Sequence, residues 1–202
     1  MTRCFSGPWR FQISRLPVNT DSMRFIIFDL EATCWEGNQV GRNQEVIEFG
    51  AVCTDRFGDC KSTFSRLVKP EQNPSLSYYC TNLTGITQAD VDSAKSFERV
   101  VSEFMHWIDI EDDQYLLCSW GDKDIDFLQS DCIYNNVEID WLVRYIDLKT
   151  QYHRIRGLQR KRGLKKVLAF EQIEFEGSHH RAYDDAVNLF SLFTKYRDLW
   201  MY

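Results

Sequence analysis

Five residues have side chains and positions suited to chemistry: Asp29, Glu31, Asp124, His180 and Asp185. Four of them are acids, and carboxylates that lie close together repel one another and raise one another's pKa. Bound divalent metal ions are the usual reason for a protein to gather such groups. If the fold brings these acids together, the sequence predicts a metal site with one histidine beside it.

Asp29 and Glu31 close a continuous apolar run that begins after Arg24. Residues two apart in a strand point to the same side, so both carboxylates can share one metal cluster. The spacing alone is not specific, because Asp109 and Glu111 repeat it in what we interpret as an acidic loop. The first pair differs in lying at the end of a buried strand. It remains interpretable as a solvated strand end until partner residues are found.

The next acid has to be chosen from Asp122, Asp124 and Asp126. A helix is predicted here, and its buried stripe contains Ile125, Leu128 and Cys132. Asp124 lies nearer to this stripe than the other two acids. Asp122 directly follows a glycine and suits a helix cap. The helical geometry therefore favours Asp124 as a metal ligand.

The last acid and the histidine are ambiguous, because His179/Asp184 and His180/Asp185 have the same five-residue offset. The buried face of the predicted helix contains Ala182, Ala186, Leu189, Phe193 and Tyr196. Asp185 lies at the edge of this face, roughly 60° away, while Asp184 points roughly 160° away, towards solvent. We therefore expect Asp185 and His180 at the site, with His179 and Asp184 away from its centre.

The elements that must position these residues are both strands and helices. Strands are predicted over 24–28, 45–54, 61–68 and 114–120, and a turn at 56–59 joins the second and third as a hairpin. Helices are predicted over 96–108, from a turn at 121–122 to about 134, and over 147–154, 163–170 and about 180–200. This order gives an α/β layered domain with a mixed sheet.

Length and composition indicate one compact domain. The chain has 202 residues, of which 44% are hydrophobic and 14% aromatic, as in a globular protein rather than a disordered one. We expect the domain over residues 23–202. Residues 1–22 are expected to be either a flexible extension or sequence upstream of the start codon that is used.

The same sequence features favour a cytoplasmic protein that is not in a membrane. No apolar run is long enough to span a bilayer, and residues 1–22 lack the apolar stretch of a signal peptide. The seven cysteines contain no C-x-x-C pair, so we expect reduced thiols rather than disulfides or a zinc site.

A local basic segment stands out against the net charge of −6. Seven of the 24 basic residues lie between positions 154 and 166: Arg154, Arg156, Arg160, Lys161, Arg162, Lys165 and Lys166. We call these seven residues the basic cluster. Two interpretations are open, a surface that follows a phosphate backbone or a solvated helix face.

Three segments of the chain resemble the three motifs of the DEDDh 3′–5′ exonucleases. They are Asp29-Leu-Glu31-Ala-Thr-Cys34, Ser119-Trp-Gly-Asp-Lys-Asp124 and Gly177-Ser-His-His180-Arg-Ala-Tyr-Asp-Asp185-Ala-x-Asn188. The Ala-Thr-Cys triplet and the segment Cys80-Thr-Asn-Leu-Thr-Gly-Ile86-Thr are most similar to the Eri/KapD-like exoribonuclease branch. The resemblance covers about residues 24–196.

This resemblance implies an RNase-H-like fold, with a mixed five-stranded sheet flanked by helices. It also implies two divalent metal ions, Mg²⁺ or Mn²⁺, held by Asp29, Glu31, Asp124 and Asp185. Such ions activate a water molecule and stabilise the leaving oxygen of a phosphodiester. His180 would take the proton from that water as general base. The product would be a nucleoside 5′-monophosphate released from a 3′ end.

The resemblance further implies contacts with the terminal nucleotide. The backbone around Ala32 and Thr33 would receive the 3′-hydroxyl, Leu83 or Ile86 would wedge against the last base, and Trp120 would pack near it. Ordinary core packing is an equally good interpretation of the three apolar side chains.

The leading hypothesis is an exoribonuclease acting on RNA with a single-stranded or short structured 3′ end. The preference for RNA rests on the branch resemblance. One alternative is a DNA 3′–5′ exonuclease of the proofreading type. The other is a KapD-like regulatory protein that acts by binding a protein partner, whose identity the sequence does not specify.

Overall fold

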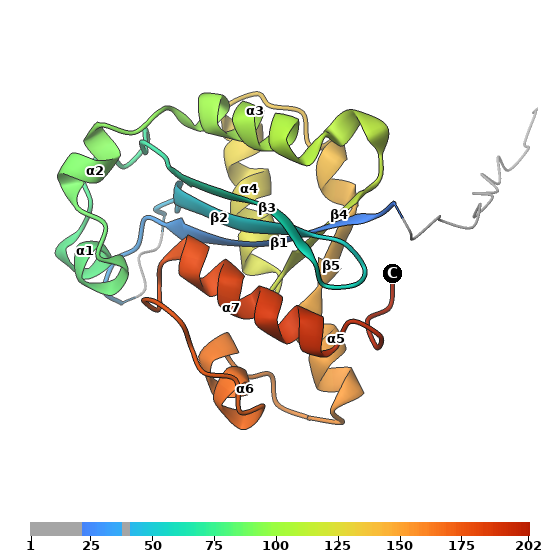
Figure 1. The fold of residues 1–202 in the computed structure, drawn as a ribbon. Coiled ribbons are helices and arrows are strands. Elements are labelled where there is room, and N and C mark those ends of the chain that lie inside the picture. Colours follow the sequence, from blue (N-terminus) through green and yellow to red (C-terminus); the bar gives the residue numbers. More distant parts are fainter. Residues whose placement is uncertain (1–21, 38–40) are drawn as a thin grey trace, which may run out of the picture.

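The computed structural model describes residues 22–37 and 41–202. Its centre is a five-stranded sheet in the order β3-β2-β1-β4-β5 (Figure 1). The strands are β1 (Arg24–Ala32), β2 (Val46–Thr54), β3 (Cys60–Leu67), β4 (Tyr115–Ser119) and β5 (Tyr145–Asp147). The first three pair antiparallel, and β4 and β5 extend the sheet with parallel pairings.

Helices cover both faces of this sheet (Figure 1). They are α1 (Tyr78–Thr84), α2 (Gln88–Asp92), α3 (Phe97–Ile108), α4 (Lys123–Tyr134), α5 (Leu148–Ile155), α6 (Leu164–Phe170) and α7 (Ala182–Lys195). On β1, Ile26 and Phe28 pack towards α3 and α4, whereas Phe25 and Ile27 pack towards α5, α6 and α7. A central strand buried on both faces explains the continuous apolar run. Among the described residues, no helix combines the length and apolar character needed to cross a membrane.

The predicted α/β architecture with a mixed five-stranded sheet flanked by helices is confirmed. Four of the strands were predicted from their apolar runs, but β1 continues to Ala32, so Asp29 and Glu31 lie inside the strand. Three elements were not predicted, α1, α2 and β5, because their 7, 5 and 3 residues are too few to show a period. The predicted extension, residues 1–22, lies outside the described residues except for Ser22.

The predicted bounds of the last helix were wrong at both ends. The helix begins at Ala182 and ends at Lys195 rather than running over 180–200. His180 has a φ of +66°, in the left-handed region, and Arg181 is extended, so the chain cannot be helical before Ala182.

Gly50 determines how closely α7 approaches the sheet. It lies on β2 directly opposite Asp29 of β1. A Cβ atom at this position would lie 2.1 Å from the backbone carbonyl carbon of Ala182. Only glycine therefore allows the first turn of α7 to lie on the sheet beside Asp29, and that turn carries Asp185.

Candidate active site

A cleft of about 420 Å³ lies where β1, α4 and the start of α7 meet. Its walls include the four predicted acids, Asp29, Glu31, Asp124 and Asp185, together with His180. The structure therefore brings together five residues that span more than 150 positions of the sequence.

The acids come from two strand positions and two helices. Asp29, Glu31 and Asp185 each offer a carboxylate oxygen, and these three oxygens lie within 4.8 Å of one another. Asp124 sits in the first turn of α4, where its Oδ1 accepts a hydrogen bond from the backbone N–H of Leu30 at 3.3 Å. That bond ties the start of α4 to β1 between the two strand acids.

Burial and mutual repulsion make this cluster unfavourable in its fully ionised form. Both effects, burial first, raise the pKa of Asp29 well above its ordinary value and that of Glu31 to about 8. Burial also raises the pKa of Asp124 to about 7, against the effect of its bond from Leu30. Oxygen donors that are gathered and repel one another in this way suit hard divalent ions such as Mg²⁺ or Mn²⁺.

His180 lies beside the acids, and the pKa of its imidazole is lowered. Burial is the largest cause, and the nearby His179 and Lys165 lower this pKa further, against the carboxylate of Asp185, which raises it. The backbone N–H of His180 donates to Oδ2 of Asp185 at 2.9 Å. The left-handed backbone of His180 thus directs an N–H to the acid and leaves its imidazole ring in the cleft.

The structure corrects the expected position of His179. Nδ1 of His179 lies 3.1 Å from Oδ1 of Asp185, and its ring stacks on that of His180 with centroids 3.9 Å apart. The helical angles used for the prediction do not apply, because residues 179–181 precede the helix. Asp184 lies outside the cleft lining, where it accepts the backbone N–H of Ser178 at 2.7 Å.

Glu48 was not predicted as a site residue, yet it faces Glu31 across the pairing of β1 and β2. Its side chain is 2% exposed, pairs with Arg181 at 2.8 Å and accepts the backbone N–H of Ala182 at 2.9 Å. Glu48 thereby fixes the start of α7 and adds to the repulsion on Glu31. The available signal was an acid within an otherwise apolar strand, since unpaired acids are rarely buried.

The five residues predicted to contact substrate divide into two groups. Ala32, Leu83 and Trp120 line the cleft. Trp120 donates its indole N–H to the carbonyl of Arg162 at 3.1 Å, which fixes the plane of its ring.

Ile86 and Thr33 do not line the cleft. Ile86 is 1% exposed and belongs to a small core cluster with Ile47 and Val91, so its side chain cannot reach a base. The N–H of Thr33 donates to Glu45, and its carbonyl accepts from the side chain of Gln44. The sequence could not separate Leu83 from Ile86, because it gave no helix bounds in this region.

Several cleft residues carried no recognisable signal in the sequence: Trp35, Gln44, Tyr79, Lys123, Phe127 and Leu164. Leu164 begins α6, directly after the loop that contains much of the basic cluster. Within that cluster, Arg156 pairs with Glu171 at 3.3 Å and Lys161 with Asp147 at 3.8 Å. The loop of the basic cluster reaches the edge of the cleft because the carbonyl of Arg162 accepts the indole N–H of Trp120 and Leu164 follows the loop, and both Trp120 and Leu164 line the cleft.

Comparison with known proteins decides the family. The sequence profile described as "Exonuclease" (RNase T) matches residues 26–193. The chain belongs to this exonuclease family. The nuclease domain of 3′hExo, a DEDDh family member solved with bound rAMP, superimposes on this exonuclease-family chain with a TM-score of 0.81. The two are 28% identical, and the match covers 87% of this chain and 92% of that domain. The predicted exonuclease family and its RNase-H-like fold are confirmed.

Curated relatives agree with this family. ERI1 exoribonuclease 2 of Mus musculus is 31% identical over 185 residues, covering 81% of this chain and 27% of the relative. The 3′-5′ exoribonuclease 1 of Rattus norvegicus is 30% identical over 172 residues, covering 81% and 50%. Probable 3′-5′ exonuclease KapD of Bacillus subtilis (strain 168) is 29% identical over 170 residues, covering 83% and 82%. The chain thus spans 27% of the length of the mouse relative and 50% of the length of the rat relative.

Proposed function

We propose that this chain is a metal-dependent 3′–5′ exoribonuclease that releases nucleoside 5′-monophosphates from RNA 3′ ends. The observation that carries the proposal is the approach of the Asp29, Glu31 and Asp185 oxygens within 4.8 Å, in a cleft of an exonuclease-family fold. Among the described lining residues, Lys123 is the one lysine or arginine beside the four acids, whereas two divalent cations would balance four negative charges.

In this proposal Asp29, Glu31, Asp124 and Asp185 hold two ions, Mg²⁺ or Mn²⁺. When bound, such ions lower the pKa of a water molecule and stabilise the charge on the leaving oxygen. The four carboxylates suit these ions because they are hard oxygen donors. The raised pKa values of Glu31 and Asp124 mean that protons compete with the metal for the same oxygens.

The general base in this proposal is His180. Its lowered pKa favours the neutral ring, in which one ring nitrogen can accept the proton of the attacking water. His179 and the backbone N–H of His180 hold Asp185 in place. We assign the wall of Ala32, Leu83 and Trp120 to the terminal nucleotide.

The preference for RNA is supported by the relatives. Two of them are named exoribonucleases, and a solved structure with a TM-score of 0.82 describes recognition of the histone mRNA stem-loop 3′ end by a 3′-exonuclease. We propose that the substrate of this chain is RNA with a single-stranded or short structured 3′ end. A cytoplasmic location is part of the proposal, supported by the free thiols of all six described cysteines.

Purified protein should be tested on matched RNA and DNA oligonucleotides with Mg²⁺ or Mn²⁺, using a 5′ label to follow shortening. We expect a ladder that shortens from the 3′ end, faster on RNA, and abolished by EDTA. A clear preference for DNA would overturn the substrate assignment in favour of a proofreading-type enzyme. If neither nucleic acid is degraded with either metal, the enzymatic proposal fails, and a protein that acts through partner binding becomes the better account.

A further inference from the structure

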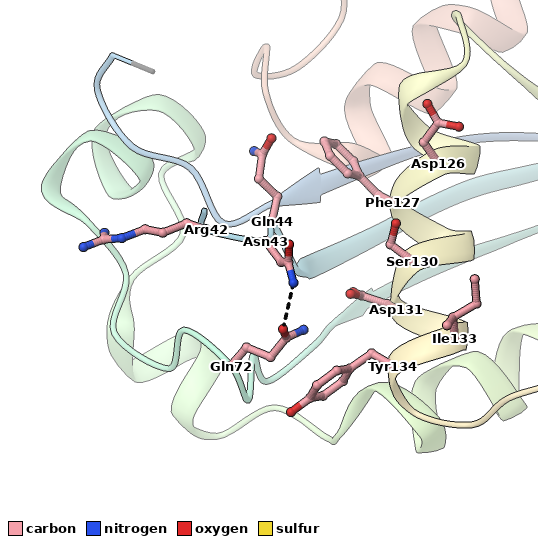
Figure 2. A pocket seen from close by; sticks show the side chains of 10 residues that line it. All are labelled: Arg42, Asn43, Gln44, Gln72, Asp126, Phe127, Ser130, Asp131, Ile133 and Tyr134. Atoms are coloured by element: carbon pink, nitrogen blue, oxygen red, sulfur yellow. Dashed lines mark hydrogen bonds between the residues drawn. The ribbon is translucent and has the colours of Figure 1, made fainter. Parts of the chain in front are cut away.

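A second cavity of about 570 Å³ adjoins the candidate active site. Figure 2 shows the residues that line it. It lies between α4 and the segment before β2. Gln44 and Phe127 line both this cavity and the catalytic cleft, so the two spaces are neighbours across these side chains. Its volume is in the range of pockets that bind small molecules and is large enough for a nucleoside.

One face of α4 connects the two spaces. Asp124, Phe127 and Asp131 follow one another at spacings of three and four, which places them in a row along the helix. Asp124 and Asp131 are about 10 Å apart along the helix axis, at a rise of about 1.5 Å per residue. A stacked strand rises about 3.4 Å per nucleotide, so 10 Å corresponds to about three nucleotides. RNA that ends at Asp124 can therefore place an upstream base near Asp131.

The polar groups of the cavity are arranged for hydrogen bonding. Asp131 is 4% exposed, its Oδ2 accepts the backbone N–H of Val46 at 2.7 Å, and its carboxylate points into the cavity (Figure 2). Asn43 Nδ2 donates to Gln72 Oε1 at 3.3 Å. That bond orients both amides, so Gln72 presents its amide nitrogen as a donor and Asn43 its amide oxygen as an acceptor. The rings of Phe127 and Tyr134 supply apolar surface.

This lining favours a base over a phosphate group. Asp126 and Asp131 bring two acids to the cavity, against one cation, Arg42, among its described lining residues. A carboxylate accepts hydrogen bonds, so it selects a ligand edge with N–H donors. Guanine presents two adjacent N–H groups next to an acceptor oxygen, whereas uracil presents one N–H between two acceptors.

We propose that this cavity binds the Watson–Crick edge of a guanine a few nucleotides upstream of the RNA 3′ end. Asp131 accepts hydrogen bonds from the N1–H and 2-amino groups, and the Gln72 amide donates to O6. The inference rests on the proposed function, since it assigns the cavity to the same RNA whose 3′ end enters the cleft. It makes the enzyme selective for sequence upstream of the bond that is cleaved.

The test is a binding scan with oligouridylate that carries one guanine, moved position by position away from the 3′ end. The 202-residue chain with Asp29→Ala is used so that the RNA stays intact, and affinity is measured by fluorescence anisotropy with Mg²⁺ present. We expect one guanine position to bind about tenfold more tightly than uridine. Inosine at that position, which lacks the 2-amino group, should lose most of the gain.

Two further variants locate the effect. Asp131→Asn and Gln72→Ala, each added to the Asp29→Ala protein, should remove the guanine preference while binding to plain oligouridylate is retained. Gln72 is half-buried at the surface, so its variant remains informative if Asp131→Asn fails to fold. Asp140→Asn, an exposed acid outside the cavity lining, is the matched control and should keep the preference.

The outcomes separate this inference from the proposed function. RNA that is degraded by the wild-type protein and bound without any guanine dependence would overturn the inference alone. A guanine preference that survives both Asp131→Asn and Gln72→Ala would place the selectivity elsewhere and would also overturn it. No degradation of RNA by the wild-type protein would overturn the proposed function, and the inference with it.

Discussion

Asp185 is held from two sides by the histidines that precede α7. The ring of His179 lies 3.1 Å from its carboxylate, and the backbone N–H of His180 lies 2.9 Å from it. His180 thus holds Asp185 through its backbone, which leaves its ring nitrogens for proton transfer. We infer that His179 positions a metal ligand, whereas the ring of His180 takes part in the chemistry.

This division of roles predicts different effects of two alanine variants. His180→Ala should lower kcat by about 10²–10⁴-fold, the usual contribution of a general base. It should leave Mn²⁺ affinity nearly unchanged, because the backbone N–H at that position remains. His179→Ala should weaken Mn²⁺ binding more than it lowers kcat at saturating metal. Kinetics on RNA with calorimetric Mn²⁺ titration distinguish the two, and identical profiles for both variants would contradict the assignment.

The acids predict an unusual dependence of stability on pH in the metal-free protein. The pKa of Glu31 rises from 4.5 to about 8 on folding, chiefly through burial, and that of Asp124 from 3.8 to about 7. Between these values the folded state holds protons that the unfolded state has released. Protonation of Glu31 and Asp124 therefore makes its whole contribution to the free energy of unfolding below their pKa in the unfolded state. This contribution is lost as the pH rises through their pKa in the folded state.

Urea unfolding in EDTA measures this contribution. The difference in free energy of unfolding between Glu31→Gln and the wild type should grow in favour of the variant as the pH rises from 5 to 8 (about the range of the shift). Added Mn²⁺ should stabilise the wild type most at the higher pH. A difference that stays constant over this range would contradict the raised pKa of Glu31.

Among the contacts between elements, the one between β2 and α7 does most to set the geometry of the site. Gly50 lets the helix lie on the sheet opposite Asp29, and the buried Glu48 fixes its first turn through Arg181 and the N–H of Ala182. The approach of Asp185 to Asp29 thus depends on the absence of a side chain at Gly50 and on the ion pair between Glu48 and Arg181.

Gly50→Ala should therefore damage stability and activity together. Its Cβ would overlap the backbone of Ala182, which cannot move away as a flexible side chain can. Overpacking costs about 1–3 kcal/mol where side chains can adjust, and we expect at least the upper end of this range. Urea unfolding and Mn²⁺ titration are the measurements.

Gly163→Ala is the control for Gly50→Ala. A Cβ at Gly163 meets no atom within 4 Å, and its φ of −66° suits any residue. We expect its unfolding free energy to change by less than about 1 kcal/mol. If Gly50→Ala behaved like this control, the close approach of α7 would not be essential.

The elements also show what the sequence could and could not predict. Long apolar runs and helical stripes predicted β1, α3 and α4, because burial on a regular period leaves a clear pattern. The three residues of β5 leave no such pattern. The position of His179 was predicted wrongly because His180, with its left-handed backbone, precedes the helix, so helical angles do not apply to His179. A backbone angle of this kind cannot be read from residue types. The four acids were predicted correctly as neighbours, whereas Glu48 was recognised only from strand register.

At the scale of the whole molecule, the charge is distributed unevenly. The chain carries a net charge of −6, yet the basic cluster at 154–166 borders a cleft that contains four acids. Lys165 is close enough to lower the pKa of His180. Cations at the edge of an acidic site can hold an RNA backbone while metal ions occupy the acids.

Charge reversal at Lys165 and Lys166 tests whether the cluster binds RNA. The double variant to Glu should weaken RNA binding and make the slope of log K against log salt less negative, by about 0.7 for each lost phosphate contact with a single strand. Lys69→Glu, on the exposed side chain that follows β3, should leave the slope unchanged. If the double variant also leaves it unchanged, the cluster is a solvated surface.

The central claim is that the four acids form a metal-dependent site that shortens RNA from its 3′ end. The most direct measurement follows 5′-labelled RNA with Mn²⁺, comparing the wild type with Asp29→Asn and identifying the released mononucleotides. We predict stepwise shortening with nucleoside 5′-monophosphates as products, and loss of activity in the folded Asp29→Asn protein. Undiminished degradation by Asp29→Asn, or nucleoside 3′-monophosphates as products, would contradict it.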